Sequence, residues 1–289
     1  MPIFPAAAAM SCLLMSSVAA QDPDEIMRRM AASVEASVDA RRQYVYKQRV
    51  TARLLRTNGH VARQETRVYT AAPGPEKTEK TLVSLAGEYH KSRTQIVKYD
   101  TPGFEKGGID IDGGIMADLV DELVNDKTSR DGIPHKMFPL RKRDLAAYTF
   151  TFKETTEVKG RKAYRIAFEP AHKTTCLSIG SEDECGDSRP WRGEVVVDAE
   201  EFQPVRIYTD LSFKMPWGVK VFLGTNIRQV GFSVAYSRLG RDVWFPVSYG
   251  TEFKLDLLFG YHRVITLALD SSEFQRGEAK SEIKYGAPQ

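Results

Sequence analysis

The stretch GEVVVDAEEFQPVRIYTD, residues 193–210, decides the fold class because it holds two β-strands and the turn that joins them. In its second half, Val205 and Ile207 alternate with Arg206 and other polar side chains. A period of two is typical of a strand that buries one face and exposes the other to water. Asp198 and a later proline bound the polar turn between the two runs. The stretch therefore predicts an antiparallel hairpin.

The same alternation recurs along most of the chain and predicts about ten strands. Besides the strand that opens the quoted stretch, they fall approximately at residues 44–54, 61–70, 81–97, 148–152, 164–168, 205–213, 230–236, 243–253 and 265–269. Short connections between them favour a largely antiparallel meander in a single domain. The strand at 61–70 follows an Asn58-Gly59 turn and is rich in Arg, Gln and Glu, so we expect it to be a solvated edge.

A helix is predicted over residues 22–42, immediately before the first strand. Asp22 is the expected N-cap, Pro23 occupies the first helical position, and Glu25 completes a capping-box pattern. Apolar residues then recur at helical spacing and form one narrow stripe on an otherwise charged helix. A stripe of this width predicts a helix that lies on a sheet.

A second amphipathic helix is predicted over residues 115–125, after a glycine-rich loop at 102–114 whose part 107–114 we expect to act as a hinge. Each strand has only one apolar face, so the sheet needs a cover, and a sheet this long is expected to curl. The fold class is therefore mainly β (α+β): a curved antiparallel sheet with both helices covering its concave face. Alternation alone does not separate a closed barrel from a sandwich.

Residues 1–20, MPIFPAAAAMSCLLMSSVAA, carry no charge and end in small residues, which is typical of a signal peptide cleaved near Ala20. A buried strand or helix is the alternative interpretation, and lipidation of Cys12 is a further one. We predict an exported protein, periplasmic or secreted, with one domain at residues 21–289. No other segment reaches 18 consecutive apolar residues, so no transmembrane helix is predicted in the mature chain.

Two cysteines, Cys176 and Cys185, remain once residues 1–20 are removed. In an oxidising compartment, two cysteines this close together most simply form one disulfide. A metal site that includes His172 is the alternative, but a structural zinc needs four ligands and no fourth partner stands nearby. We expect the disulfide and no metal.

Two stretches resemble a known family. VKGRKAYRIAFEP, residues 158–170, is similar to the Gly-x-x-x-Tyr strand entry of the LolA/LolB/LppX superfamily, and residues 193–210 resemble its strand–Asp–turn–Pro–strand hairpin. This superfamily comprises periplasmic lipoprotein carriers and relatives, including sensor domains like that of RseB. The resemblance covers most of residues 22–270. It implies a half-barrel closed by helices, with an apolar concave face that holds acyl chains.

Charge and motifs narrow the class of function. The 41 basic and 38 acidic side chains give a net charge of only +3, so nucleic acid is not an expected partner. Signatures of hydrolases, metalloproteases and phosphate-binding loops are missing, and the five histidines are scattered. Asp110 and Asp112 are spaced like the start of a calcium loop, but the third oxygen ligand and the distal glutamate are missing. We predict neither an enzyme nor a cofactor.

The segment SFKMPWGVKVFLG, residues 212–224, is unusually apolar and is broken by Pro-Trp-Gly. We expect it to form the rim of an apolar groove, because such a surface accepts chains of varied length. A hydrophobic hairpin packed on a helix and an exposed patch for a partner protein are the alternatives. The residues expected to line the groove are Phe213, Met215, Trp217, Phe232, Phe245 and Phe253, with Met116 and Leu119 from the second helix.

The sequence thus favours an exported, non-catalytic binding protein that holds a lipid, an acyl chain or a lipoprotein. The expected partner is a lipid or a lipidated protein, with peripheral contact to envelope membranes or their proteins. The cluster Arg141-Lys142-Arg143 is interpreted either as a site for anionic head groups or as a solvated turn. The alternative function is a structural or interaction module of the cell envelope with a filled core.

Overall fold

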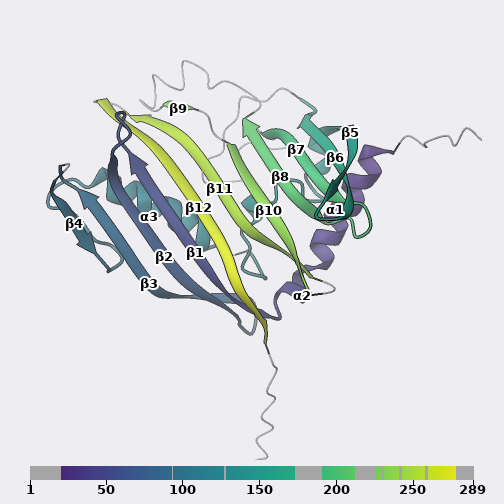
Figure 1. Ribbon diagram of the computed structural model, residues 1–289, viewed down its shortest axis with the longest axis horizontal. Coiled ribbons are helices and arrows are strands. Elements are labelled where there is room, and N and C mark those ends of the chain that lie inside the picture. Colours follow the sequence, from purple (N-terminus) through teal and green to yellow (C-terminus); the bar gives the residue numbers. More distant parts are fainter. Residues whose placement is uncertain are drawn as a thin grey trace, which may run out of the picture.

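One antiparallel sheet contains every strand in the part of the chain that the structure describes (Figure 1). The computed structural model describes residues 21–92, 94–126, 128–172, 191–211, 226–228, 231–240, 243–257 and 260–277. The strands are β1 (Tyr44–Leu55), β2 (Val61–Pro73), β3 (Thr78–His90), β4 (Ile96–Tyr99), β5 (Tyr148–Val158), β6 (Arg161–Pro170), β7 (Trp191–Asp198), β8 (Pro204–Leu211), β9 (Asn226–Arg228), β10 (Gly231–Leu239), β11 (Val243–Leu257) and β12 (Tyr261–Arg276). The helices are α1 (Pro23–Ala36), α2 (Val38–Arg41) and α3 (Ile111–Val124), with 3-10 turns η1 (His135–Met137) and η2 (Leu145–Ala147).

The sheet is open, and its strands follow the order β4-β3-β2-β1-β12-β11-β10-β8-β7-β6-β5, with the short β9 paired to β11. Helices α1 and α3 pack against it, and α3 lies behind β1 and β2 in Figure 1. This arrangement confirms the prediction of a mainly β fold with a largely antiparallel sheet covered by helices. Strand β1 pairs with β2 on one side and with β12 on the other, so the first and last strands are neighbours.

The hairpin at residues 193–210 forms as β7 and β8, and Asp198 at its turn explains why. The Asp198 carboxylate accepts the backbone N–H groups of Glu200 and Glu201 at 3.1 and 2.8 Å. It also accepts Nε and Nη2 of Arg161 at 2.7 and 2.9 Å. Burial by itself raises the pKa of Asp198, but the hydrogen bonds from Arg161 and the two N–H groups lower it below its ordinary value. The turn is therefore built around one buried anion.

Strand β2 is not the solvated edge that its composition suggested, because it lies inside the sheet between β1 and β3. Its side chains Arg63, Glu65 and Arg67 are buried. A buried charge is tolerated where it is paired and hydrogen-bonded, and these three side chains find such partners beneath α3. The prediction was wrong because charge was taken to imply exposure.

The N-terminal helix begins where predicted, with the Asp22 side chain accepting the backbone N–H of Asp24 at 3.0 Å. The Glu25 carboxylate pairs with Arg28 in the same turn. The predicted helix over residues 22–42 is interrupted at Ser37, which separates α1 from α2. The Ser37 hydroxyl donates to the carbonyl of Ser33 at 2.7 Å, a contact that bends helices.

Helix α3 begins at Ile111, four residues earlier than predicted, because Asp110 caps it. The Asp110 side chain accepts the N–H of Gly113 at 3.0 Å and that of Lys106 at 3.1 Å. Residues 111–114 are thus the first helical turn and not the end of a hinge loop. In the described residues, no helix is long and apolar enough to cross a membrane.

The main hydrophobic core lies between the sheet and the two long helices, and both helices contribute fully buried side chains to it. These include Met27 and Met30 from α1, Met116 and Val120 from α3, and Ile166, Val195, Ile207, Val234 and Ile265 from the sheet. A second, smaller cluster contains Tyr46, Ala71, Val243 and Phe245.

We predict that Asp198→Asn lowers the free energy of unfolding by about 2 kcal/mol, since the change removes the charge that Arg161 neutralises but leaves an oxygen for the turn. Urea unfolding followed by circular dichroism measures this difference. Glu194→Gln, at an exposed position of the same strand β7, is the matched control and should change stability by less than about 0.5 kcal/mol. Equal midpoints for the two variants would contradict the role given to Asp198.

Candidate functional site

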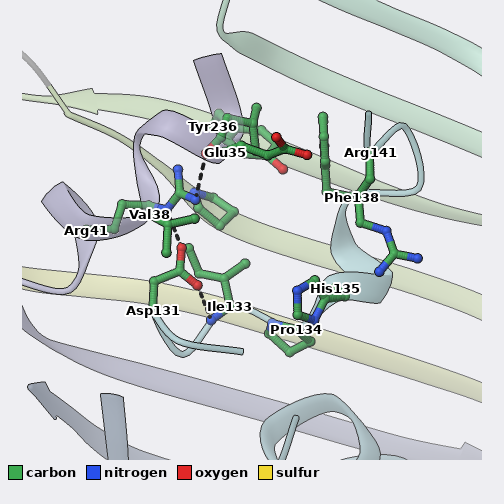
Figure 2. Close-up of a pocket in the computed structure, with 12 residues that line it drawn as sticks. Glu35, Val38, Arg41, Asp131, Ile133, Pro134, His135, Phe138, Arg141 and Tyr236 are labelled. Atoms are coloured by element: carbon green, nitrogen blue, oxygen red, sulfur yellow. Dashed lines mark hydrogen bonds and ion pairs between the residues drawn. The ribbon is translucent and has the colours of Figure 1, made fainter. Parts of the chain in front are cut away.

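A half-open pocket lies between the N-terminal helices, the segment after α3 and the sheet (Figure 2). Its volume is about 150 Å³. A cavity of that size holds a molecule like benzene, with about six heavy atoms. It therefore fits a ring, an apolar side chain or one end of an acyl chain, but not a whole long chain. The lining residues are Val34, Glu35, Val38, Arg41, Asp131, Ile133, Pro134, His135, Phe138, Arg141, Tyr236 and Pro246.

A buried ion pair between Arg41 and Asp131 forms part of the wall. The Nε of Arg41 lies 2.6 Å from Oδ2 of Asp131, and the two side chains are only 5% and 7% exposed. Arg41 also donates from Nη2 to the carbonyl of Val34 at 3.1 Å, while Asp131 accepts the Ser129 hydroxyl and the Ile133 N–H, both at 3.2 Å. These bonds fix α1 and α2 against residues 129–133. Desolvation offsets most of the attraction between buried charges, so the pair adds little net stability. Its main effect is to fix the positions of the helices relative to residues 129–133.

Hydrogen bonds to carboxylates also hold the rim of the pocket. Asp126 accepts the backbone N–H of His135 at 2.8 Å and the hydroxyl of Thr128 at 2.7 Å, and it lies 3.1 Å from Nδ1 of His135. Burial raises the pKa of Asp126, but the hydrogen bonds from His135 and Thr128 outweigh it and hold the pKa well below its usual range. Arg141 donates to Asp144 at 2.8 Å. Arg143 lies 3.8 Å from the same carboxylate, so Asp144 engages two residues of the cationic cluster at 141–143.

On the sheet side, the pocket is closed by a β-bulge. Tyr236 of β10 faces Pro246 of β11, whereas the preceding Ala235 faces Ser248, so Val247 is the extra residue. Proline has no N–H to donate and is compatible with a central strand at such a bulge. Bulges re-aim side chains next to sites, and here the bulge lies where Tyr236 and Pro246 line the pocket.

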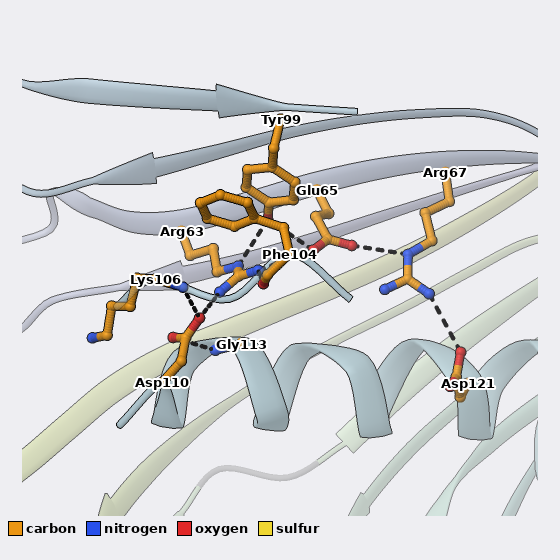
Figure 3. A network of polar contacts seen from close by, with 9 residues as sticks. All are labelled: Arg63, Glu65, Arg67, Tyr99, Phe104, Lys106, Asp110, Gly113 and Asp121. Carbon is orange, nitrogen blue, oxygen red and sulfur yellow. Dashed lines mark hydrogen bonds and ion pairs between the residues drawn. The ribbon is translucent and has the colours of Figure 1, made fainter. Parts of the chain in front are cut away.

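A second polar network holds α3 on the sheet (Figure 3). Arg63 is 2% exposed and donates from Nε to the Tyr99 hydroxyl at 2.7 Å and from Nη1 to Asp110 at 2.6 Å. Its Nη2 donates to the carbonyl of Phe104 at 2.8 Å. The Tyr99 hydroxyl in turn donates to Glu65 at 2.7 Å. One buried guanidinium therefore fixes both the loop before α3 and the N-cap of the helix.

The network continues along β2 toward the middle of the helix. Glu65 accepts Nε of Arg67 at 2.8 Å, and Nη1 of Arg67 reaches Asp121 of α3 at 3.3 Å. The Tyr99 ring crosses the strand at Gly87, where a Cβ atom would overlap the ring. The absence of a side chain at Gly87 is thus what allows Tyr99 to reach Glu65.

A third arginine binds the first turn of α3 from strand β12. Arg263 of β12 donates from Nε and Nη2 to the two oxygens of Asp112 at 2.9 and 3.0 Å, and the Tyr261 hydroxyl donates to the same carboxylate at 2.6 Å. Such paired, charge-assisted hydrogen bonds are among the strongest in proteins. Lys80 adds a hydrogen bond from Nζ to the carbonyl of Val124 at the other end of the helix, at 3.0 Å.

The eight residues predicted to line a groove are only partly brought together. Phe232 and Met116 are buried in the main core, and Leu119 and Phe253 pack against it. Phe245 belongs to the second cluster, with Tyr44, Tyr46 and Phe274 around it. Phe213, Met215 and Trp217 lie outside the described residues, as do residues 1–20 and both Cys176 and Cys185.

The side chains considered as calcium ligands have other partners. Asp110 is bound by Arg63, and Asp112 is bound by Arg263. Within the described ranges, no group of three or more His, Cys, Asp or Glu side chains could hold a metal ion.

The pocket itself was not predicted from the sequence, because Arg41, Asp131 and Tyr236 come from three distant parts of the chain. The network beneath α3 did have a local signal. Arg63, Glu65 and Arg67 are spaced two apart, so they share one face of a strand and alternate in sign. On a buried strand face, that pattern indicates side chains that neutralise one another, whereas an edge strand would expose its charges to water.

The arrangement of the sheet and helices is similar to that of several solved structures. They include a DUF1329 family protein from Desulfovibrio piger, with a TM-score of 0.39 and 13% identity, covering 90% of this chain and 96% of that one. A Vibrio parahaemolyticus domain, named for outer membrane lipoprotein sorting, has a TM-score of 0.37 and 7% identity, covering 89% and 95%. A LolA superfamily protein from Nitrosomonas europaea has a TM-score of 0.30 and 13% identity, covering 86% and 94%.

These similarities concern the architecture alone. No protein-family model and no curated protein sequence matches the chain.

We predict that Arg63→Met lowers the free energy of unfolding by about 3–5 kcal/mol, because it leaves the Asp110 carboxylate without its buried cation and removes one of the two arginines beside Glu65. Thermal unfolding measures the loss, and limited proteolysis should show earlier cleavage in the loop before α3. Arg53→Met, on the exposed face of β1, is the control and should leave both readouts nearly unchanged. A similar melting temperature for the two variants would show that Arg63 does not hold α3.

The carboxylates of Asp110, Asp126 and Asp198 predict acid sensitivity, since each has a pKa below its ordinary value in the folded protein. The unfolded chain takes up protons first as the pH falls through about 4, so stability is full above that value and is lost below it. Urea midpoints at pH 7, 5, 4 and 3 measure the decline. Asp110→Asn should make the decline shallower, and an unchanged pH dependence in that variant would contradict the assignment.

Proposed function

We propose that this is an exported, non-catalytic binding protein that holds a lipid, an acyl chain or a lipidated protein between its sheet and helices. The observation that carries the proposal is the pocket beside α1 and α2, whose walls are formed largely by Val34, Val38, Ile133, Phe138 and Pro246. Apolar walls with few polar groups are typical of ligand sites. The pocket takes about six heavy atoms, so it would hold one end of a chain whose remainder lies elsewhere.

The proposed path for the remainder follows the apolar residues of the core face. Phe232, Phe253, Met116 and Leu119 belong to or pack against the main core, and Phe245 lies in the neighbouring cluster. We propose that Phe213, Met215 and Trp217 complete this surface. Ligand entry would then require α3 to shift, which the arginine contacts of Arg63, Arg67 and Arg263 oppose.

Periplasmic or secreted localisation belongs to the same proposal. It follows from the uncharged, apolar residues 1–20, with cleavage near Ala20, and from the two cysteines of the mature chain paired as Cys176–Cys185. The expected partners are lipids, lipidated proteins, and envelope membranes or their proteins.

A second candidate function is an envelope interaction module with a filled core. It is favoured by the tight burial of three residues expected in the groove, because Met116, Phe245 and Phe232 are only 0%, 1% and 6% exposed. Residues that a ligand must touch would have to become accessible, whereas a module that binds through its outer surface has no such requirement.

We predict that Val38→Phe, which fills the pocket from α2, weakens binding of a dansyl-labelled fatty acid about tenfold or more, because close-packed sites do not tolerate overlap. Fluorescence titration of the mature protein measures the change. Val83→Phe adds the same group at a position on β3 that is 59% exposed and outside the pocket, so it serves as the matched control.

The titration is paired with native mass spectrometry of protein purified from its own envelope fraction. A co-purifying lipid that is lost in Val38→Phe and retained in Val83→Phe supports the proposal. A protein that carries no lipid and ignores added fatty acid and lipopeptide would favour the interaction module.

A further inference from the structure

Two hydrogen-bond donors in the pocket have no acceptor among the described residues. Tyr236 lines the pocket and is 7% exposed, and no described residue forms a hydrogen bond with its hydroxyl. Burial raises the pKa of the Tyr236 hydroxyl well above its ordinary value. It remains protonated at physiological pH and is available to donate.

The second donor is the Nη1 group of Arg41. The Nε and Nη2 groups of this side chain are bound to Asp131 at 2.6 Å and to the carbonyl of Val34 at 3.1 Å. These two bonds fix the guanidinium plane, and no described residue accepts from Nη1. Arg41 and Tyr236 both line this pocket.

Neither atom is among the described side-chain atoms that are fully buried without a partner, so water reaches both donors in the half-open pocket. A ligand that fills the pocket displaces this water, and a buried donor left without an acceptor is costly. The ligand that fits must therefore supply the acceptor itself. The missing partner is an acceptor, such as a carbonyl oxygen, and two donors match its two lone pairs.

The charges around the pocket indicate that the acceptor is uncharged. Arg41 is neutralised by Asp131 at 2.6 Å, and Arg141 at the rim is engaged by Asp144 at 2.8 Å. Glu35, which also lines the pocket, adds a negative charge. A carboxylate or phosphate would lose its hydration and meet no unbalanced positive charge, which makes its entry unfavourable.

We propose that this pocket binds an uncharged carbonyl group carried on a short apolar group, with Tyr236 and Arg41 as its two donors. The inference rests on the proposed binding function and deepens it, because it specifies the chemistry of the part of the ligand that enters. An ester of an acylated molecule and an amide of a peptide share this chemistry. With about six heavy atoms of room, the carbonyl enters together with a chain of four or five carbons.

The test is an NMR titration of the mature protein, following the backbone amides of β10 and of residues 131–138. Four probes are used: methyl butanoate as the ester, N-methylbutanamide as the amide, butanoate as the anion and pentane as the hydrocarbon. We expect the ester or the amide to bind more tightly than butanoate, and the tighter of the two identifies the source of the carbonyl.

The decisive variant is Tyr236→Phe, which removes only the hydroxyl. It should weaken binding of the carbonyl probe about three- to tenfold, the effect of one hydrogen bond between uncharged groups, and leave pentane binding unchanged. Tyr164→Phe is the control, because Tyr164 is also buried in the main core but does not line the pocket.

The outcomes separate the two proposals. If pentane and the carbonyl probes bind equally, or if Tyr236→Phe affects neither, the pocket is an apolar site and the carbonyl inference is wrong while the binding function stands. Tighter binding of butanoate would also overturn the inference. If no probe shifts these amides, the pocket is not a ligand site, and the binding function that rests on it falls as well.

Discussion

The position of helix α3 depends on one buried guanidinium, that of Arg63. It holds Asp110 at 2.6 Å, the Phe104 carbonyl at 2.8 Å and the Tyr99 hydroxyl at 2.7 Å. The loop that leads into the helix, the N-cap of the helix and the edge of the sheet therefore meet at a single side chain. Neutral packing would give the helix many equivalent positions along the sheet, whereas a buried charge with three fixed acceptors allows only one.

A buried ion pair also fixes the N-terminal helices on the sheet. Arg41 and Asp131 form a pair that is almost fully buried, and they attach α2 to the segment that follows α3. Arginine–aspartate pairs thus fix both helical covers, three of them at α3 and one at α2, and the apolar core beneath the helices supplies the stabilising burial. Because Asp131 lies in the segment that follows α3 directly, we expect a displacement of α3 to change the pocket beside α1.

Much of the fold could be predicted from the sequence because the signals are local. The alternation of Val205 with Arg206 indicated a strand, and Asp22 marked the start of the first helix. Strand β2 was misjudged because the partner of Arg63 is Asp110, 47 residues away. No window of a single strand contains that information, and a charged face without its partners resembles a solvated one.

The pocket could not be predicted either, because its residues lie even farther apart in the sequence. Its ion pair joins residues 90 positions apart, and Tyr236 comes from still farther along the chain. The aromatic residues predicted for a groove were chosen by size and alternation. Those properties identify Phe232 as a core residue, but they do not distinguish a core from a cavity wall.

The pairing of β1 with β12 has a consequence for biosynthesis. Strands β1–β4 form one meander and β5–β11 another, and β12 is what joins them in the sheet. About 200 residues of chain separate the end of β1 from the start of β12. At roughly 5–20 residues per second, the ribosome needs about 10–40 s to make that stretch. During that interval, the edge of β1 that later pairs with β12 has no partner. The nascent sheet of β1–β4 therefore exposes this edge until β12 has been made.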